Sequence, residues 1–412
     1  MQHPPSPADL TLAQARILLE AKLSGRAGGP VDMALDQAAG TSLAEALYAP
    51  GDLPPFDNSA MDGYALNTAD LRGDPPYRLP LDGTTLAGEA PPPLTPGHAR
   101  RITTGAALPL QANTVIIQEW VQRDGEEIQF ERSVAAGNCI RAAGSDVGQG
   151  DLLLPLSTRL GALQLALAAN VGVARLKVRP RPTVAVLSTG SELVEPGRTR
   201  GPGKIYDSNR YLLAELAEQL GGDVVYANTC GDDRSALIRA LESATSVADI
   251  VVTSGGVSVG DADLLPGLIA QLGEVYFHKL ALKPGRPVLF GELNQTPILA
   301  LPGNPVSVLV TCLQLLAPAL DHLSGALVRQ PLRMSAQLDG KVSKAHSRLE
   351  FQRGRINQSA SGKLWVSPVA GQGSHQLAAL RDADCFLVLP EGPQSYAHGD
   401  SVFVEPLIQY FR

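Results

Sequence analysis

Apolar residues recur along this chain in two rhythms, one typical of helices and the other of strands. Positions 12–23 carry an apolar stripe at helical spacing behind a capping-box pattern at Thr11 and Gln14, which predicts one helix. A shorter helical piece is predicted around 34–39. Between about 77 and 140, short β-branched runs alternate with Pro and Gly turns, which predicts a small β-rich domain.

The later part of the chain changes its period twice. Ser157 is expected to cap a long helix over 160–170. From 183 onward, strand-like and helical runs alternate, as in an open parallel sheet with helices on its faces. After Gly325 the chain returns to short strands, which predicts a C-terminal β-barrel or sandwich.

The bulk composition limits the class of protein. A chain of 412 residues is expected to hold roughly three or four domains. Its 44% apolar and 18% charged content is typical of a soluble globular protein. The net charge of −7 argues against a general nucleic-acid surface, which needs clustered Lys and Arg over a broad face. An anionic ligand must therefore meet local cations.

Cysteine spacing and hydropathy indicate a cytoplasmic location. The four cysteines lie far apart without a C-x-x-C pair, which argues against a zinc knuckle, a thioredoxin motif or a disulfide framework. The first residues do not resemble a signal peptide, and no run of about eighteen apolar residues predicts a membrane span. The seven histidines lack the spacing of a helical metal site, and His278 is interpreted as a packing residue.

One stretch, 249–307, gathers the features of an anion-binding site. A buried strand over 249–253 runs into a glycine-rich loop. The loop reads Ser254, Gly255, Gly256, Val257, Ser258, Val259 and Gly260. Its glycines permit positive φ and close backbone approach, so the loop can offer several N–H groups to a phosphate.

Two further segments of this stretch add cations and a helix start. Lys279, Lys283 and Arg286 lie around a Lys-Pro-Gly-Arg-Pro turn. The strand 297–301 ends in a second polar turn, which reads Pro302, Gly303, Asn304, Pro305, Val306 and Ser307. Asn304 suits a helix N-cap and Pro305 the first helical position, so the exposed N–H groups there predict another anion seat.

Three acids, Glu192, Asp232 and Asp263, follow the ends of predicted strands. Because the carboxyl ends of parallel strands meet at one edge of a sheet, we expect these acids to converge with the Gly255–Gly256 turn. Carboxylates that face lysines across a glycine loop fit a Mg²⁺ ion bridging ligand oxygens, with Lys neutralising phosphate. Each acid taken alone reads equally as a helix cap or a solvated loop residue.

Rival motifs were weighed against this interpretation. The chain has neither the G-x-x-x-x-G-K-[ST] of a P-loop nor a G-x-G-x-x-G after a strand. The segment 256–260 does match G-x-S-x-G, the nucleophile elbow of serine hydrolases. Ser258 follows its strand by several residues, however, and Lys279 and Lys283 have no role in ester hydrolysis. Phosphate or oxyanion chemistry is therefore favoured over hydrolysis by Ser258.

Six motifs, in order, resemble the molybdopterin molybdotransferase family, the MoeA family shared with the gephyrin E domain. The resemblance runs from about Leu12 to the C-terminus. The motifs are PPFDNSAMDGYA at 54–65, RITTGA at 101–106, STGSEL at 188–193, SGGVSVGDAD at 254–263, KLALKPGRP at 279–287 and LPGNPVS at 301–307. By composition alone the first two read equally as ordinary turns. The departures are Arg286 where the family commonly has Lys, and Asn113, Ser145 and Ser191 where it commonly has acids.

The resemblance implies the last step of molybdenum cofactor synthesis, in which adenylylated molybdopterin and molybdate react, with Mg²⁺, to give molybdenum cofactor and AMP. It implies a multidomain α/β plus β fold with four domains. These are an elongated, helix-containing, discontinuous domain (1–51 and 141–178), a small β-rich domain (52–140), a MogA-like open parallel α/β domain that binds molybdopterin (179–327) and a C-terminal β-barrel (328–412). It also implies a homodimer, with each active site at the cleft between the α/β domain of one subunit and the β-rich domain of the other.

The same motifs carry over a set of site residues. The catalytic residues would be Asp62, Thr104 and Asp146 from one subunit, and Glu192, Asp232, Asp263, Lys279 and Lys283 from the other. Asp232 and Asp263 would hold Mg²⁺, and the two lysines would hold molybdate and phosphate oxygens. The residues that bind the pterin and pyrophosphate would be Ser254, Gly255, Gly256, Ser258, Arg286, Pro302, Gly303, Asn304 and Ser307.

Expected partners are the small-molecule substrates, the adenylyltransferase of the same pathway and the apo-molybdoenzymes, without nucleic acid or membrane. Two other functions stay open. The chain could be a related adenylyltransferase, which would consume ATP by itself, or a non-catalytic scaffold for partner peptides. A scaffold could lose the acids of the site, and this chain keeps them.

Overall fold

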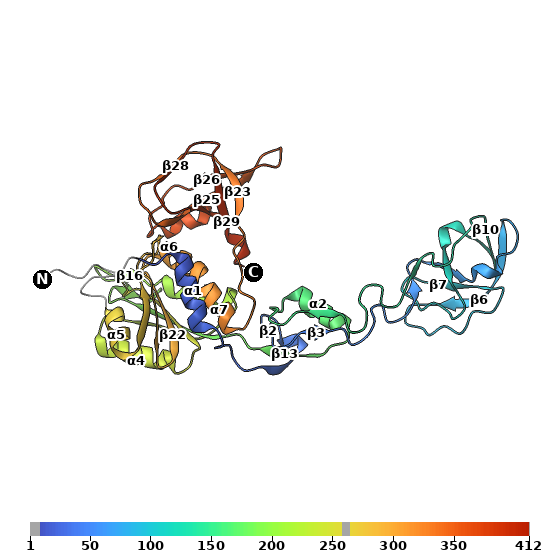
Figure 1. The fold of residues 1–412 in the computed structure, drawn as a ribbon, viewed down its shortest axis with the longest axis horizontal. Helices are drawn as coiled ribbons and strands as arrows, with labels where there is room; N and C mark the ends of the chain where they lie inside the picture. Colours follow the sequence, from blue (N-terminus) through green and yellow to red (C-terminus); the bar gives the residue numbers. More distant parts are fainter. Residues whose placement is uncertain (1–8, 258–263, 412) are drawn as a thin grey trace.

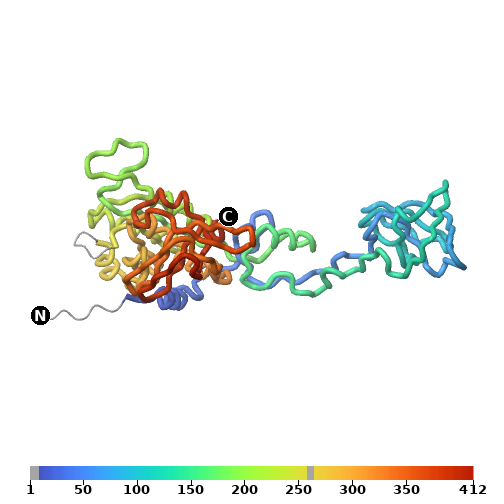
Figure 2. The backbone as a smooth tube through the Cα atoms, turned by 90° about the horizontal axis from the view of Figure 1, so that it is seen from above, coloured from blue at the N-terminus to red at the C-terminus, as the bar shows by residue number. Residues whose placement is uncertain are grey.

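The molecule consists of a body with two domains and a long arm (Figure 1, Figure 2). The computed structural model describes residues 9–257 and 264–411. The arm, residues 27–180, leads away from the body to a small β domain at its tip (Figure 1). The body holds α1 (Leu12–Leu23), an α/β domain and a C-terminal barrel. This is the α/β plus β fold class that the sequence predicts.

The base of the arm is an antiparallel sheet of three strands in the order β1-β13-β2, covered by one helix. Its elements are β1 (Val31–Ala34), η1 (Leu35–Gln37), β2 (Ser42–Leu43), β3 (Leu47–Tyr48), β12 (Leu152–Leu154), α2 (Ala162–Asn170) and β13 (Arg175–Arg179). Leu43, Leu160, Leu176 and Val178 form its small core. Two distant segments of the chain thus build one unit.

Two helix predictions in this unit are wrong in detail. The piece expected at 34–39 is only the 3₁₀ turn η1, because β1 pairs with β13 and the Leu35 N–H bonds to the carbonyl of Ala174. The helix expected from Ser157 begins at Ala162 behind Gly161. Ser157 instead lies in a turn with φ +66° and donates its N–H to the Leu43 carbonyl.

The tip of the arm is a β domain with a sheet of six strands in the order β8-β5-β7-β6-β10-β9. Its elements are β4 (Asn58–Ser59), β5 (Gly63–Leu66), η2 (Thr68–Asp70), β6 (Tyr77–Thr85), β7 (Ala99–Ile102), β8 (Thr114–Ile117), η3 (Gln118–Trp120), β9 (Gln122–Asp124), β10 (Glu127–Phe130) and β11 (Ile140–Arg141). Tyr64, Leu79, Ile116 and Phe130 belong to its core. The predicted β-rich character is therefore confirmed.

The α/β domain is built on a sheet of six strands in the order β17-β14-β18-β22-β21-β19. Its elements are β14 (Thr183–Thr189), β15 (Leu193–Val194), β16 (Ile205–Tyr206), α3 (Asn209–Gln219), β17 (Asp223–Cys230), α4 (Arg234–Thr245), β18 (Ile250–Ser254), α5 (Leu264–Leu272), β19 (Glu274–His278), β21 (Leu289–Leu293) and β22 (Thr296–Leu301). The first four strands of the order are parallel. β21 then pairs antiparallel with β22, and β19 pairs antiparallel with β21.

Both faces of this sheet are buried, which explains the continuous apolar runs of its central strands. Val184 and Val186 of β14 point into a core shared with α1 and α3, whereas Ala185 and Leu187 point into a second core with α4 and α5. α1 therefore packs in the body, although the predicted first domain includes its residues. Because successive side chains of a strand point to opposite faces of the sheet, β14 packs against one helical layer on each face.

A nearly continuous helical run crosses the centre of the body. It consists of α6 (Pro305–Thr311), a π-helical segment η4 (Cys312–Leu316) and α7 (Ala317–Leu323). Within the described ranges, this 19-residue run is the one helix that is long and apolar enough to cross a membrane, with a mean hydropathy of 1.6 in its most apolar window. However, 94% of that window is buried inside the protein, as in the core helix of a globular domain. Gln314 and Asp321 interrupt it, so a search for unbroken apolar sequence misses it.

The C-terminal domain is a barrel closed by five strands, since β23, β26, β25, β27 and β29 pair in a ring. Its elements are β23 (Met334–Leu338), β24 (Val342–Lys344), β25 (Leu349–Gln358), β26 (Leu364–Pro368), η5 (Leu377–Asp382), β27 (Cys385–Leu389), β28 (Gln394–Tyr396), β29 (Ser401–Pro406) and η6 (Leu407–Gln409). The short strand β20 (Leu282–Lys283) of the α/β domain pairs with β25, with Lys283 opposite Glu350. The barrel is thereby joined to the lysine segment of the α/β domain.

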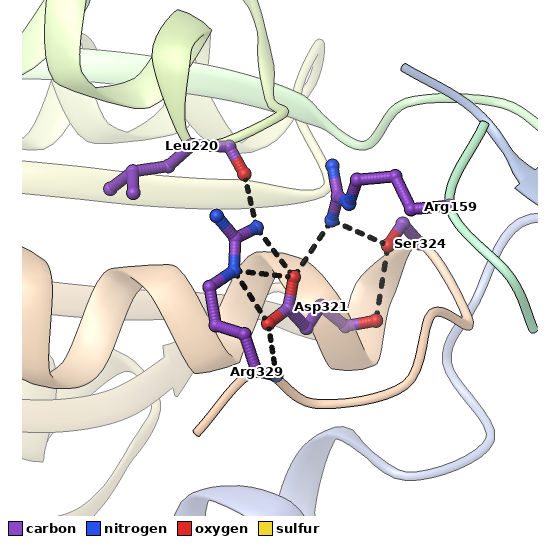
Figure 3. Close-up of polar contacts among 5 residues, drawn as sticks. All are labelled: Arg159, Leu220, Asp321, Ser324 and Arg329. Carbon is purple, nitrogen blue, oxygen red and sulfur yellow. Dashed lines mark hydrogen bonds and ion pairs between the residues drawn. The ribbon is translucent and has the colours of Figure 1, made fainter. Parts of the chain in front are cut away.

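The arm, the α/β domain and the chain leading to the barrel meet at one buried carboxylate (Figure 3). Asp321, which is 1% exposed, accepts hydrogen bonds from Arg159 of the arm and from Arg329, which precedes the barrel. Arg329 also donates to the carbonyl of Leu220 at the end of α3 (2.7 Å). This joint fixes the base of the arm against the body.

Candidate active site

A cavity of about 340 Å³ lies where β14, β18 and β22 end in the α/β domain. Its lining residues come from the turns that follow these strands, as expected for the carboxyl edge of a parallel sheet. They include the predicted residues Glu192, Asp232, Ser254, Gly255, Gly256, Pro302 and Gly303. The structure therefore brings together these separate motifs, from Glu192 to Gly303, around one space.

The glycine loop enters this cavity with a backbone that tolerates no side chain. Gly255 and Gly256 have φ of +91° and +65°. A Cβ on Gly255 would overlap the carbonyl oxygen of Thr189, whereas a Cβ on Gly303 would make only an ordinary van der Waals contact with the Cα of Gly255. The Gly255 N–H is bonded to the Leu301 carbonyl at 3.1 Å, which ties the loop to β22. Glycine is required here for both conformation and space.

Two of the three predicted acids lie within the described residues of the site. Glu192 and Asp232 are both exposed at the cavity. Asp232 is held by Ser191, whose N–H donates to its carboxylate (2.8 Å) while the Ser191 hydroxyl accepts from the Asp232 N–H (3.0 Å). Ser191, which stands where the family commonly has an acid, thus joins the loops after β14 and β17.

Sequence reasoning missed a buried carboxylate and an amide in the same cavity. Asp207 is 1% exposed and accepts hydrogen bonds from the hydroxyls of Ser188 (3.1 Å) and Thr229 (2.8 Å). Asn209 donates to the hydroxyl of Ser254 (2.8 Å) and to the Gly303 carbonyl, and so connects two glycine turns. Both residues lie at the start of α3, where Asp and Asn are common in any helix, so the sequence alone gave no sign that they line the cavity.

A second cavity, of about 300 Å³, adjoins the first and shares Pro287 and Pro302 with it. It holds the predicted residues Lys283, Arg286, Asn304 and Ser307. The barrel supplies its other wall with Arg348, Glu350, Phe351, Gln372, Gly373 and Ser374. Three cationic residues, Lys283, Arg286 and Arg348, therefore line one cavity.

The charge pairing in this second cavity differs from the prediction. Lys283 was expected to face the acids of the α/β domain, but its Nζ lies 3.0 Å from a carboxylate oxygen of Glu350 in the barrel. Arg286 pairs with Asp9 at 2.6 Å, and this hydrogen bond and charge raise the pKa of its guanidinium. The barrel therefore contributes residues to the second cavity, whereas every site residue predicted from the sequence lies before residue 308.

The helix start at Asn304 is less open than the sequence indicates. Pro305 is indeed the first helical residue, but the side chain of Asn304 makes no capping bond. The N–H of Val306 already donates to the carbonyl of Ser374 in the barrel (3.1 Å). One donor of the expected anion seat is therefore used to dock the barrel, and Asn304 itself lines the second cavity.

Lys279 belongs to neither cavity lining, although it lies between the two turns in sequence. Its backbone adopts φ +88°, an uncommon and strained conformation for a residue with a side chain. The preceding His278 places Nε2 2.9 Å from the carbonyl of Val257 and so contacts the end of the glycine loop. His278 thus has a positioning contact beyond the packing role expected for it.

The three predicted residues of the arm lie far from both cavities in the same chain. Asp62 and Thr104 adjoin β5 and β7 at the arm tip, at the opposite end of the molecule from β16 of the first cavity (Figure 1). The Thr104 N–H and hydroxyl donate to Asp62 at 2.7 and 2.9 Å and lower the pKa of its carboxyl. Asp146 is exposed near the tip, where its N–H bonds to the Leu53 carbonyl.

Two predicted residues, Ser258 and Asp263, lie outside the described residues. Within the ranges that are described, no three His, Cys, Asp or Glu side chains gather closely enough to hold a metal ion alone. Mg²⁺ commonly uses one or two carboxylates together with substrate phosphate and water. The exposed carboxylate of Asp232, with Glu192 in the same cavity, fits such a partial site.

Comparisons with known proteins agree along almost the whole chain. Three family models match: the MoeA N-terminal region (domain I and II) at residues 9–172, a probable molybdopterin binding domain at 185–322, and the MoeA C-terminal region (domain IV) at 335–407. The chain is 39% identical over 376 residues to the molybdopterin molybdenumtransferase of Haemophilus influenzae, which covers 90% of this chain and 92% of that protein.

More distant species give the same picture. The molybdopterin molybdenumtransferase 2 of Mycobacterium tuberculosis is 35% identical over 389 residues, 92% of this chain and 95% of that one. Among solved structures, the molybdopterin biosynthesis moeA protein of Pyrococcus horikoshii OT3 superposes with a TM-score of 0.80 at 29% identity, over 96% of this chain and 99% of that chain.

Proposed function

This chain belongs to the MoeA family of molybdopterin molybdenumtransferases and inserts molybdenum into molybdopterin, and we propose that it does so in two adjoining cavities, one for adenylylated molybdopterin and one for molybdate. AMP is the second product in this proposal. The observation that carries it is the division of charge between the two cavities, which share Pro287 and Pro302.

The first cavity suits the nucleotide-bearing pterin. Glycines with positive φ let a phosphate or a flat ring approach the backbone closely, which larger residues at these positions would prevent. Asn209 and the turn hydroxyls offer polar groups to the edges of a heterocycle, and the buried Asp207 holds the hydroxyls of Ser188 and Thr229 in place. Gly255, Gly256 and Gly303 are the residues that bring the substrate against the sheet edge.

The second cavity suits a tetrahedral dianion. Lys283, Arg286 and Arg348 supply positive charge, and Asn304 and Ser307 supply neutral polar groups. Cations of this kind are the usual partners of oxyanions, and Arg adds directed donors to the point charge of Lys. An oxyanion there would lie beside the substrate in the first cavity, because the two spaces share a wall.

Magnesium dependence is part of the proposal. Asp232 and Asp263 would hold Mg²⁺, which when bound supplies positive charge to the phosphoanhydride that is cleaved. Ser191 orients the carboxylate of Asp232 through its N–H, so that the remaining oxygen can face the cavity.

A second copy of the chain is proposed to complete the site. Asp62, Thr104 and Asp146 lie on the arm, away from the cavities of their own body (Figure 1). In a two-fold symmetric dimer the same arm can reach the body of the other copy. The Asp62 carboxylate, kept ionised by its hydrogen bonds to Thr104, would then meet the substrate from the opposite side.

The proposed setting is the cytoplasm, with the adenylyltransferase of the same pathway upstream and apo-molybdoenzymes downstream. The support is indirect, since the relatives named above act in molybdenum cofactor synthesis.

A pair of substitutions tests the division of labour between the cavities. Asp232→Asn should lower Mg²⁺-dependent AMP release about tenfold or more while molybdate binding persists, because only the first cavity changes. Lys283→Ala should instead weaken molybdate binding. Both are measured with purified protein, adenylylated molybdopterin and molybdate, with the exposed Lys363→Ala as a matched control. Undiminished AMP release by Asp232→Asn would contradict the role of Asp232, and unchanged molybdate binding by Lys283→Ala would contradict the assignment of the second cavity.

A further inference from the structure

Glu350 is a buried carboxylate shared by two basic side chains. It is 3% exposed, and its Oε1 lies 3.0 Å from the Nζ of Lys283. Its other oxygen, Oε2, lies 3.0 Å from Nε2 of His346. Gln352 donates to Oε1 at 3.2 Å. Lys283 and His346 therefore approach the same acid from the cavity side and from the barrel side.

His346 stands in an environment crowded with positive charge. It lies between β24 and β25, and the charged groups that face it are Glu350 on β25, Lys344 on β24, Arg348 before β25 and Lys283 on β20. Lys344 is 4% exposed and donates to the carbonyl of Arg348, with Glu391 as a further acid nearby. Among the described residues, neither ring nitrogen of His346 makes a hydrogen bond and Oε2 of Glu350 makes none either, so the two side chains lie at ion-pair distance without a hydrogen bond between them.

An anion that enters the second cavity competes with Glu350 for Lys283. The side chain of Lys283 is 44% exposed toward the cavity, whereas Glu350 is enclosed. If the amine turns toward a dianion, a buried carboxylate loses part of its compensation, which is costly in a protein interior. His346 is the neighbouring group that can change its charge near neutral pH and restore that compensation.

We propose that His346 takes up a proton when a tetrahedral oxyanion occupies the cavity of Lys283 and Arg348, so that Glu350 keeps a cationic partner while Lys283 turns to the anion. His346 is thus a positioning residue that touches Glu350 and acts on the anion through Lys283. The inference rests on the proposed function in one respect, the assignment of this cavity to molybdate. The proton comes from solvent and the anion remains the dianion, so charge is balanced.

The direction of the pH dependence follows from the charges around the ring. Burial is the largest cause that lowers the pKa of His346; Glu350 opposes it, and Lys283, Arg348 and Lys344 add to it. A dianion beside these cations cancels part of their repulsion, so the pKa of His346 is higher in the complex than in the free protein. Anion binding is therefore strengthened below the pKa of the complex, and this gain is lost as the pH rises through that value.

Calorimetry of the full-length protein with molybdate alone tests this coupling. Titrations in two buffers of different ionisation enthalpy should show uptake of a fraction of a proton, up to about one, per molybdate bound near pH 6.5. The Kd should weaken about threefold to tenfold between about pH 6 and about pH 8, below the roughly hundredfold limit that one fully coupled proton would give over two pH units.

Two substitutions of His346 separate charge from structure. His346→Gln should abolish proton uptake and keep the weak affinity at all pH values, whereas His346→Lys should abolish uptake and keep the tight affinity, because its charge is permanent. His398→Gln is the matched control, since His398 lies 3.4 Å from Asp339 on an exposed part of the barrel and should retain the wild-type coupling.

The outcomes separate the two claims. Molybdate binding without proton uptake in the wild type, or uptake that persists in His346→Gln, would overturn the role of His346 and leave the cavity assignment intact. Wild-type affinity in Lys283→Ala would instead remove the cavity itself from molybdate binding. Weak binding by His346→Lys at low pH, with the variant folded by circular dichroism, would also overturn the proposal.

Discussion

At the scale of single residues, the site depends on where the backbone can go. The loop after β18 passes so close to Thr189 that only glycine fits at Gly255. The positive φ and close backbone approach that the glycine pattern predicted are found at Gly255 and Gly256, and phosphate binding by this loop stays a prediction. The sequence could not predict that the carbonyl oxygen of Thr189 leaves no room for a side chain at Gly255, because Thr189 lies on another strand.

Two glycine substitutions should have opposite effects on stability. Gly255→Ala combines positive φ with overlap of the Thr189 carbonyl, so it should cost about 1–3 kcal/mol and raise the KM for the pterin substrate. Gly267→Ala, in the exposed face of α5 with nothing near its Cβ, should stabilise the fold by about 0.5–1 kcal/mol and leave KM unchanged. Urea denaturation and steady-state kinetics measure both. A neutral Gly255→Ala would show that the loop can shift without cost.

The acids and cations of the site were not equally visible in the sequence. Glu192 and Asp232 could be brought together in advance because strand ends of a parallel sheet share one edge. Arg348 and Glu350 could not, since their place beside Lys283 depends on how a separate barrel docks through β20 and β25. Asp207 was hidden for another reason, because an acid before a helix looks like an ordinary cap.

At the scale of elements, the helical run from α6 to α7 lies at the centre of the body, and the other parts of the body pack against it. Pro318 has no N–H to give to the carbonyl of Gln314, and the run adopts a π-helical segment just before it. Arg16 of α1 donates to that carbonyl (3.0 Å) and to the Gln314 side chain (2.7 Å). Gln314 in turn donates to the fully buried Glu405 of the barrel (2.6 Å). Through Gln314, the π-helical segment thus connects α1, the central helical run and the barrel.

Loss of this link should be costly compared with loss of a surface ion pair. Burial is the main cause that lowers the pKa of Arg16, while Tyr410 and Glu405 oppose it. Arg16→Met removes two hydrogen bonds to Gln314 and should destabilise the body by about 1–3 kcal/mol. Arg381→Met, which breaks a fully exposed pair with Asp382, should leave the stability almost unchanged, because water screens the two charges. The midpoint of chemical denaturation compares them, and equal small losses would mean that the network carries no net stability.

At the scale of the whole molecule, the separation of arm and body is the reason to expect a shared site. Asp62 and Thr104 adjoin β5 and β7 at the arm tip, far along the molecule from the body (Figure 1), whereas the two cavities of the body gather residues of the later motifs. The family resemblance implied four domains, and the structure adds that the β domain at the arm tip lies far from the body (Figure 2). That distance arises from the two-part base of the arm, which no local periodicity encodes.

Mixing two inactive variants should restore activity if the site is shared. A mixed dimer of Asp62→Asn and Lys283→Ala contains one site with both substitutions and one with neither, so random exchange should recover about a quarter of the wild-type activity. A mixture of Asp232→Asn and Lys283→Ala should recover none, because both changes lie on the body. Recovery is measured as AMP release after co-refolding or co-expression. Absence of any recovery in the first mixture, with mixed dimers present, would contradict a site built from two copies.

The carboxylate of Asp321 gives the molecule a mechanical property. Arg159 and Arg329 bond to the side chain of Asp321 from opposite directions (Figure 3). The base of the arm and the segment that leads to the barrel are therefore fixed to the same carboxylate. Removing one partner of such an enclosed ionic contact costs about 3–5 kcal/mol, far above thermal energy. A rotation of the arm about its base would therefore strain the segment that leads to the barrel, so we expect the arm and the barrel to move together.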